Sequence, residues 1–330
     1  MKVLVTGCAG MIGTKLIEML INSNIAVVGC DNFFRGEREN IDFLEALATQ
    51  KGTEFEFYEL DLLVGLPLEM LTNIDTVVHL ADVVGGIKYV FDHEFEVFNS
   101  NVIIDANTVR SVASSSVKKY IYAATACSFP HQLQSSVDSV LYEKDKFPAE
   151  PESSYGWSKL VGELQSVYLN KIDGLETARV IFHNVYGPWC DFDLNTSQVI
   201  PALIKKANDL EAGDKLEVWG DGKQARSFIN SYDIANSLLT MITGDVPLKE
   251  FDSVQLGSKI GTTIEELARI ILQMCGKDPS LIKYVNPNFQ GDTGRVPDLT
   301  LAIRLGLAQS VEIKQGVQEL IEWAKNNGKI

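Results

Sequence analysis

Short apolar runs alternate with helix-periodic segments through the first half of the chain. The first run is followed by apolar residues at Ile12, Leu16, Met19 and Leu20, which is the spacing of one helix face. Strands separated by helical segments are typical of parallel sheets. The pattern therefore predicts an α/β fold with a Rossmann-type doubly wound parallel sheet. Its strands are expected near residues 2–6, 25–30, 54–60, 75–80, 118–124 and 177–182, with a long helix near 95–113.

The alternation becomes less regular after residue 183. Residues 183–188 end in Gly-Pro and predict a turn that closes the first half. We therefore expect a nucleotide-binding domain at 1–183 and a smaller C-terminal α/β substrate lobe at 184–330, with an interleaved boundary. In the lobe, strands are expected near 216–219 and 226–229, and helices near 199–210, 232–243, 264–275 and 311–326.

The composition of the chain argues against several classes of function. The formal net charge is -15, so nucleic acids and anionic membranes are poor partners. No apolar run is long enough for a membrane helix, and the first residues enter a strand without a signal-peptide pattern, so a cytoplasmic protein is expected. Five widely spaced cysteines and four scattered histidines argue against a disulfide framework and a metal site.

A glycine-rich turn follows the first strand. Gly7, Gly10 and Gly13 allow a tight turn, close approach of backbone to a pyrophosphate, and a helix N-terminus that faces the phosphates. Asp31 ends the second strand, 18 positions after Gly13, where a carboxylate can accept from the ribose hydroxyls and repel a 2′-phosphate. NAD is therefore the predicted cofactor. Arg35 and Arg38 leave an NADP alternative open.

Other strand ends extend this cofactor prediction. Asp61 is expected near the adenine and Ala81 beneath the cofactor, although Asp61 could instead be a simple loop or N-cap acid. Asn99 and Asn101 are expected on one flank of the long helix, and the Gly85-Gly86 loop is expected to approach the substrate. The predicted cofactor residues are Gly7, Gly10, Met11, Ile12, Gly13, Asp31, Asn32, Asp61, Leu62, Leu80, Ala81, Asn99, Tyr155 and Lys159.

The chemistry is predicted between residues 118 and 159. Tyr155 and Lys159 lie four apart, so on a helix they share one face. A nearby ammonium stabilises a phenolate, which predicts a lowered pKa for Tyr155 and a role as base toward a substrate hydroxyl. Thr125 follows an apolar strand at the ligand edge of the sheet. The alternative is that Tyr155 and Lys159 form a chance surface pair.

These motifs together resemble the extended short-chain dehydrogenase/reductase family of nucleotide-sugar enzymes. The resemblance implies tightly held NAD, oxidation of a sugar hydroxyl, chemistry on the resulting ketone, and return of the hydride. It also implies that Thr125 orients the sugar, Tyr155 is the base and Lys159 binds the nicotinamide ribose. It is carried by residues 6–13, Asp31, 61–62, 79–81, Thr125, Tyr155, Lys159, 184–188, 226–228 and Arg295.

Within that family, the stretches 81–86, 125–127, 148–151, 182–188 and 219–228 look most like the GDP-mannose 3,5-epimerases. Cys127 matches the cysteine that moves protons beside the ketone there; the alternative is a buried, unreactive thiol. The lysine that those enzymes carry after Tyr-Gly-Pro is absent from residues 189–201. Cys190, Asp191, Asp193 and Lys88 are the possible substitutes.

The resemblance assigns the substrate diphosphate to Arg226, Arg295 and Asn184, and Gly86 to the substrate loop; surface salt bridging is the alternative for the arginines. The predicted function is an NAD-dependent nucleotide-sugar epimerase working through a 4-keto intermediate, as a homodimer. A net C4 dehydrogenase, a dehydratase and a non-catalytic NAD-binding scaffold are the alternatives. Ala126 and Cys127 replace the acidic pair usual in the dehydratases, which argues against an ordinary 4,6-dehydratase.

Overall fold

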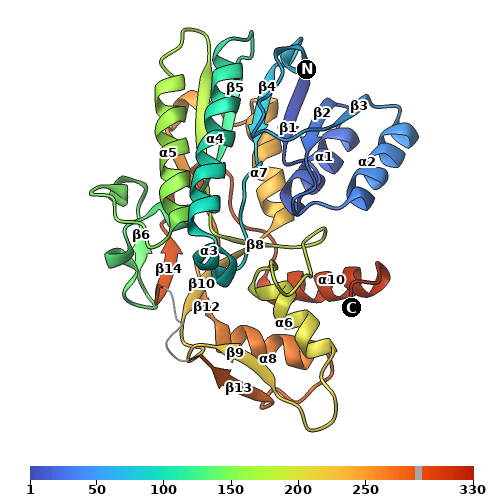
Figure 1. Cartoon of the computed structure of the whole chain (residues 1–330), viewed down its shortest axis with the longest axis vertical. Helices are drawn as coiled ribbons and strands as arrows, with labels where there is room; N and C mark the ends of the chain where they lie inside the picture. Colours follow the sequence, from blue (N-terminus) through green and yellow to red (C-terminus); the bar gives the residue numbers. More distant parts are fainter. Residues whose placement is uncertain (287–291) are drawn as a thin grey trace.

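The structure is a computed structural model that describes residues 1–286 and 292–330. Within those residues, seven parallel strands form the main sheet, in the upper part of Figure 1. Neighbouring strands far apart in sequence, such as β1 and β4, need helical crossovers, and this agrees with the predicted doubly wound fold. The strand order is β11 (Ser253–Leu256), β7 (Glu176–Phe182), β5 (Lys119–Thr125), β4 (Thr76–His79), β1 (Lys2–Thr6), β2 (Ala26–Asp31), β3 (Phe55–Glu59).

Helices cover both faces of this sheet, so its strands are apolar on both sides. In β1, Val3 and Val5 face one core while Leu4 faces the other. The first core is closed by α1 (Met11–Asn22), α2 (Arg38–Lys51), α7 (Ser231–Thr243) and α9 (Thr300–Arg304); the second is closed by α4 (Glu94–Ala113), which follows α3 (Ile87–Asp92), and by α5 (Ser154–Leu169).

The lower part of Figure 1 is a smaller lobe with its own core. In its described part, β10 pairs with β8 and β14 in parallel and with β12 antiparallel, while β14 pairs with β6. The elements are β6 (Val140–Leu141), β8 (Asn184–Tyr186), β9 (Leu216–Trp219), β10 (Ala225–Asn230), β12 (Gly261–Thr263), β13 (Ile282–Val285), β14 (Gly294–Pro297), α6 (Val199–Asn208), α8 (Ile264–Met274) and α10 (Ile313–Asn326).

The chain crosses between the two parts more than once. After β10 it returns to the main sheet, where α7 packs in the core with α1 and β11 pairs with β7. The predicted turn at residues 183–188 is wrong for its middle, because Asn184–Tyr186 forms β8 and pairs with β10. The nucleotide-binding half therefore draws on residues beyond 183. No helix in the described residues is long and apolar enough to cross a membrane.

Candidate active site

A cavity of about 1060 Å³ opens at the carboxyl ends of the main-sheet strands and extends into the second lobe. This is the edge where open α/β sheets place ligands. Its volume exceeds that of an ordinary small-molecule pocket. Among the predicted site residues, its lining includes Gly7, Gly10, Met11, Ile12, Gly13, Asp31, Asn32, Asp61, Leu62, Leu80, Ala81, Gly86, Thr125, Cys127, Tyr155, Asn184, Arg226 and Arg295.

Two predicted residues, Lys159 and Asn99, are outside this lining. Lys159 is buried on α5, and the side chain of Asn99 is exposed on α4. Two positions on, Asn101 is buried; its Oδ1 accepts from the Val83 amide at 2.6 Å and its Nδ2 donates to the Val83 carbonyl at 3.0 Å. Residues two apart on a helix do not face the same way. The expectation of one shared flank is therefore wrong, and Asn101 is the residue that orders the loop at the cavity.

Two glycines of the turn, Gly7 and Gly13, have no room for a side chain. Gly7 has φ +67°, and a Cβ there would lie 2.8 Å from the Ala81 amide nitrogen. A Cβ on Gly13 would lie 2.3 Å from the Gly7 carbonyl oxygen. The Thr6 hydroxyl accepts from the amides of Leu80 and Ala81, each at 3.2 Å, and so joins β1 to β4 beside this turn. The resulting cradle places the N-terminus of α1, with its positive dipole end, at the cavity and fits a pyrophosphate.

Asp31 lies at the end of β2 in the cavity. Its Oδ2 accepts from the Ala9 amide at 2.9 Å and its Oδ1 from the Phe33 amide at 2.8 Å, which fixes the carboxylate beside the glycine turn. Arg38 is paired with Asp42 through its Nε at 3.0 Å. This arrangement fits ribose hydroxyls better than a 2′-phosphate, as predicted for NAD.

Lys159 is 1% exposed, and its Nζ has no hydrogen-bond partner within the described residues. The ammonium lies 3.6 Å from Asp82 Oδ2 and 4.4 Å from the centre of the Tyr122 ring. The Tyr122 hydroxyl donates a hydrogen bond of 2.7 Å to Asp105 Oδ2. This ammonium makes no hydrogen bond to the described residues and lies beside the cavity residue Asp82, so it fits the hydroxyls of a bound ligand.

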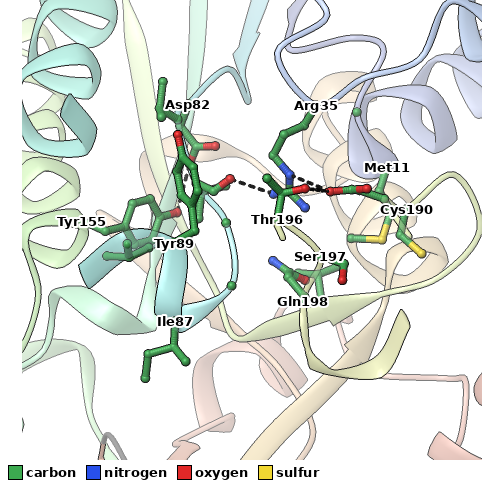
Figure 2. A pocket seen from close by; sticks show the side chains of 18 of the residues that line it. Met11, Arg35, Asp82, Ile87, Tyr89, Tyr155, Cys190, Thr196, Ser197 and Gln198 are labelled. Carbon is green, nitrogen blue, oxygen red and sulfur yellow. Dashed lines mark hydrogen bonds and ion pairs between the residues drawn. The ribbon is translucent and has the colours of Figure 1, made fainter. Parts of the chain in front are cut away.

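Tyr155 stands in the first turn of α5, where the Ser153 hydroxyl caps the helix by accepting from the Gly156 amide at 3.2 Å. Its hydroxyl donates to Asp82 Oδ2 at 2.9 Å (Figure 2). Burial raises the pKa of Tyr155 well above its ordinary value, and the charges of Asp82 and Cys127 act in the same direction. The predicted lowering of this pKa is therefore wrong for the protein's own residues, because burial and then the negative charge of Asp82 disfavour the phenolate.

A close helix contact brings Tyr155 to the end of β5. A Cβ on Gly156 would lie only 2.1 Å from the Cys127 carbonyl oxygen, so only glycine permits this approach. Thr125 Oγ1 accepts from the Cys127 amide at 3.2 Å and shapes the short 3₁₀ turn that follows β5. Thr125, Cys127 and Tyr155 are thereby placed around one end of the cavity.

Two arginines lie on adjacent strands beside Cys127. Arg226 of β10 is in register with Arg295 of β14. Burial lowers the pKa of Arg226 to about 10, and the positive charge of Arg295 adds to this effect. Arg295 donates through Nη2 to Asp292 at 2.6 Å and through Nη1 to Cys127 Sγ at 3.0 Å. Two neighbouring guanidinium groups of this kind fit a diphosphate.

The loop after β8 lies across the cavity from Tyr155 and Asp82 in Figure 2. Asp191 accepts from the Thr196 hydroxyl at 2.5 Å and lies 3.7 Å from Arg35 Nε. The Gly86 amide donates to the Thr196 carbonyl at 3.0 Å, so the two loops meet over the site.

The possible substitutes for the missing lysine are poorly suited. Cys190 is buried, and burial raises its pKa far above the usual range. Asp191 is held by Arg35 and Thr196, and Lys88 is exposed and paired with Asp92. Asp193 is outside the cavity lining and accepts from the Asn195 amide at 2.9 Å.

Sequence reasoning missed the roles of Asp82 and Asp292. Asp82 follows β4, so its place at the ligand edge was a usable signal, but its pairing with Tyr155 joins positions 73 residues apart. Asp292 had no recognisable pattern around it. Among the described residues, no three His, Cys, Asp or Glu side chains gather as a metal ion would require.

Known nucleotide-sugar enzymes resemble this chain in sequence and in fold. The model of the NAD dependent epimerase/dehydratase family matches residues 3–257. GDP-mannose 3,5-epimerase 1 of Oryza sativa subsp. indica is 28% identical over 327 residues, covering 98% of this chain and 82% of that protein. A dTDP-4-dehydro-6-deoxy-D-allose reductase of a Streptomyces species is 27% identical, covering 97% of this chain and 95% of the relative. The crystal structure of UDP-glucuronic acid 4-epimerase from Bacillus cereus, in complex with NAD, superposes with TM-score 0.81 at 22% identity, covering 99% and 97% of the two chains.

Proposed function

Because the chain belongs to the NAD dependent epimerase/dehydratase family, we propose that it is a nucleotide-sugar epimerase working through a transient 4-keto intermediate. We further propose that it exchanges protons at C3 or C5 of a GDP-linked sugar. The observation that carries this proposal is the convergence of Thr125, Cys127 and Tyr155 at one end of the cavity. The GDP-linked sugar is supported by the similarity to GDP-mannose 3,5-epimerase.

The cofactor is NAD, which when bound accepts a hydride from the sugar and later returns it. The amides that open α1 would hold its pyrophosphate, and Asp31 would accept from the adenosine ribose. Lys159 would donate to the nicotinamide ribose, because it is the buried ammonium without a hydrogen-bond partner in the described part of the chain. The backbone around Ala81 would line the same path.

Tyr155 would take the proton from the sugar C4 hydroxyl as its own phenolic proton passes to Asp82. The Tyr155 hydroxyl donates to Asp82 Oδ2 at 2.9 Å, so this acceptor is already in place. Thr125 would orient the same sugar hydroxyl from the end of β5. Proton transfer to a positioned side chain such as Tyr155 contributes a factor of about 10²–10⁴ to the rate.

Cys127 would act once the ketone has formed. The ketone acidifies the hydrogens on C3 and C5; the C–H bond breaks, its electron pair moves toward the carbonyl oxygen as an enolate, and the thiolate gains the proton. Cys127 is only half-buried and lines the cavity, so a substrate carbon can reach it. Arg226, Arg295 and Asn184 would hold the diphosphate nearby.

Chemistry at C4 alone is the second candidate. Residues 189–201 contain no lysine, and Cys190 is buried. With one proton-transfer group beside the ketone, a C4 epimerisation or a net C4 oxidation needs fewer additional residues than inversion at two carbons.

Proton NMR of nucleotide sugars incubated with the NAD-loaded protein in D₂O tests the two candidates. GDP-mannose and GDP-heptose types come first, followed by UDP and dTDP sugars. We expect deuterium at C3 or C5 of a GDP-linked sugar, because enolisation exchanges the carbon-bound proton with solvent. A sugar changed at C4 without deuterium would establish the second candidate, and accumulation of stoichiometric NADH would indicate a net dehydrogenase.

We also propose that the protein is a homodimer through α4 and α5, which lie side by side on one face of Figure 1. On α5, Trp157, Val161, Leu164 and Tyr168 follow a spacing of four, three and four, which is one helix face. Tyr168, near the end of α5, is 65% exposed, and Phe95, near the start of α4, is 75% exposed. Exposed apolar side chains along these helices favour a protein partner, and a second copy presents the same face.

Replacing Tyr168 with Glu is expected to convert the dimer to a monomer, because it buries an unpaired charge in the proposed interface. Analytical ultracentrifugation gives the mass directly. The exposed Tyr232 on α7 is the matched control, and its replacement with Glu should leave the mass unchanged. A monomeric wild-type protein would exclude this interface.

A further inference from the structure

The hydrogen bond between Arg295 and Cys127 joins the proposed diphosphate site to the proposed proton-transfer site. The Nη1–Sγ distance is 3.0 Å, and the two residues are 168 positions apart in the sequence. Arg295 is 6% exposed, so its charge acts where water screens it little. A guanidinium beside a cysteine stabilises the thiolate, which is the form that accepts a proton.

The second partner of Arg295 fixes its direction. Nη2 donates to Asp292 at 2.6 Å, and this pair presents Nη1 to the sulfur. Burial alone would lower the pKa of Arg295, but the charges of Cys127 and Asp292 outweigh burial and raise it. The Nε of Arg295 is buried and has no hydrogen-bond partner among the described residues. That donor remains for an anion in the cavity.

We propose that Arg295 is a positioning residue for proton transfer: its guanidinium holds Cys127 as the thiolate that removes a proton beside the ketone. The same side chain would hold the diphosphate through its free Nε, so substrate binding and base activation share one residue. The part played by the ketone rests on the proposed function. The effect of Arg295 on the thiol does not, since it exists before any sugar binds.

Other charged groups surround the sulfur and define the controls. Arg226 on β10 lies beside Arg295, and the Tyr155 hydroxyl approaches from α5. Asp292 and Glu152 face the arginines, and burial, followed by the charge of Asp292, raises the pKa of Glu152. Removing the charge of Arg295 should therefore raise the pH at which Cys127 reacts as the thiolate, and removing the charge of Asp292 should lower it. General loosening of the site would instead shift this pH in the same direction in both variants.

Alkylation of Cys127 by iodoacetamide across a pH series measures the thiolate directly in the NAD-loaded protein without nucleotide sugar. The Cys127 peptide is quantified by mass spectrometry, with the half-buried Cys275 outside the cavity as internal standard. Arg295→Gln is expected to move the half-maximal pH upward by about one to three units and to slow alkylation at neutral pH about tenfold or more. Asp292→Asn keeps an oxygen that can accept from Arg295 Nη2 and removes the negative charge, so it is expected to move the half-maximal pH downward.

Arg226→Gln is the matched arginine control and should shift the profile less than Arg295→Gln, because the hydrogen bond to the sulfur comes from Arg295. A wild-type profile in Arg295→Gln, an equal shift in Arg226→Gln, or shifts of the same sign in Arg295→Gln and Asp292→Asn would overturn the proposal. If Arg295→Gln does not fold, Asp292→Asn decides alone, and an unchanged profile rejects it. Since no sugar is present, these outcomes are separate from failure of the proposed epimerase activity.

Discussion

Replacing Tyr155 with Phe is expected to lower turnover of the nucleotide sugar about a thousandfold while the protein still holds NAD. The exchange removes one hydroxyl and keeps the ring that α5 packs beside the cavity. Without that hydroxyl, the sugar loses the group proposed to take the proton of its C4 hydroxyl. The NAD cradle is unaffected, because it is made by the glycine turn, Asp31 and Lys159.

The measurement pairs turnover with the NAD content of the purified protein. Tyr89→Phe is the matched control, because Tyr89 also lines the cavity but belongs to α3. Its loss should leave turnover close to wild type. Near-normal turnover in Tyr155→Phe would remove Tyr155 from the mechanism, and loss of NAD in the same variant would mean that the phenol mainly supports the cofactor.

Replacing Cys127 with Ser is expected to reduce solvent exchange at C3 and C5 by about 10²–10⁴ while hydride transfer at C4 continues. A serine hydroxyl occupies nearly the same space but is a far weaker acid than a thiol, so it is not ionised near neutral pH. The ketone should still form, because Tyr155 and Thr125 are unchanged. Deuterium incorporation by NMR follows the first process, and transient absorbance of NADH in a single turnover follows the second.

Cys275→Ser is the control for this experiment, since Cys275 is half-buried like Cys127 but lies outside the cavity lining. It should retain both processes. Loss of both exchange and hydride transfer in Cys127→Ser would mean that the thiol is structural, for instance in supporting the turn after β5. Retention of both would assign the proton transfer to another group.

The nucleotide-binding half was predictable from the sequence because its signals are local. The apolar run of β1, the glycine turn and the periodic apolar face of α1 are each set by residues a few positions apart. The same holds for Asp31 at the end of β2 and for Tyr155 and Lys159, which one helix carries. The second lobe was less predictable, because short strands such as β8 and β14 depend on partners distant in sequence.

The tertiary structure alone decided the electrostatics of the candidate site. The sequence supplied Lys159 as a neighbour of Tyr155, but folding also places Asp82 on the phenol, and burial with that negative charge reverses the expected direction of the pKa. Folding likewise brings Arg295 to Cys127 and leaves Asn99 in solvent while Asn101 is buried. Local periodicity determines which segments become strands and helices. The charge on a buried group depends on the side chains that long-range packing brings within a few ångströms, and those positions have no fixed spacing in the sequence.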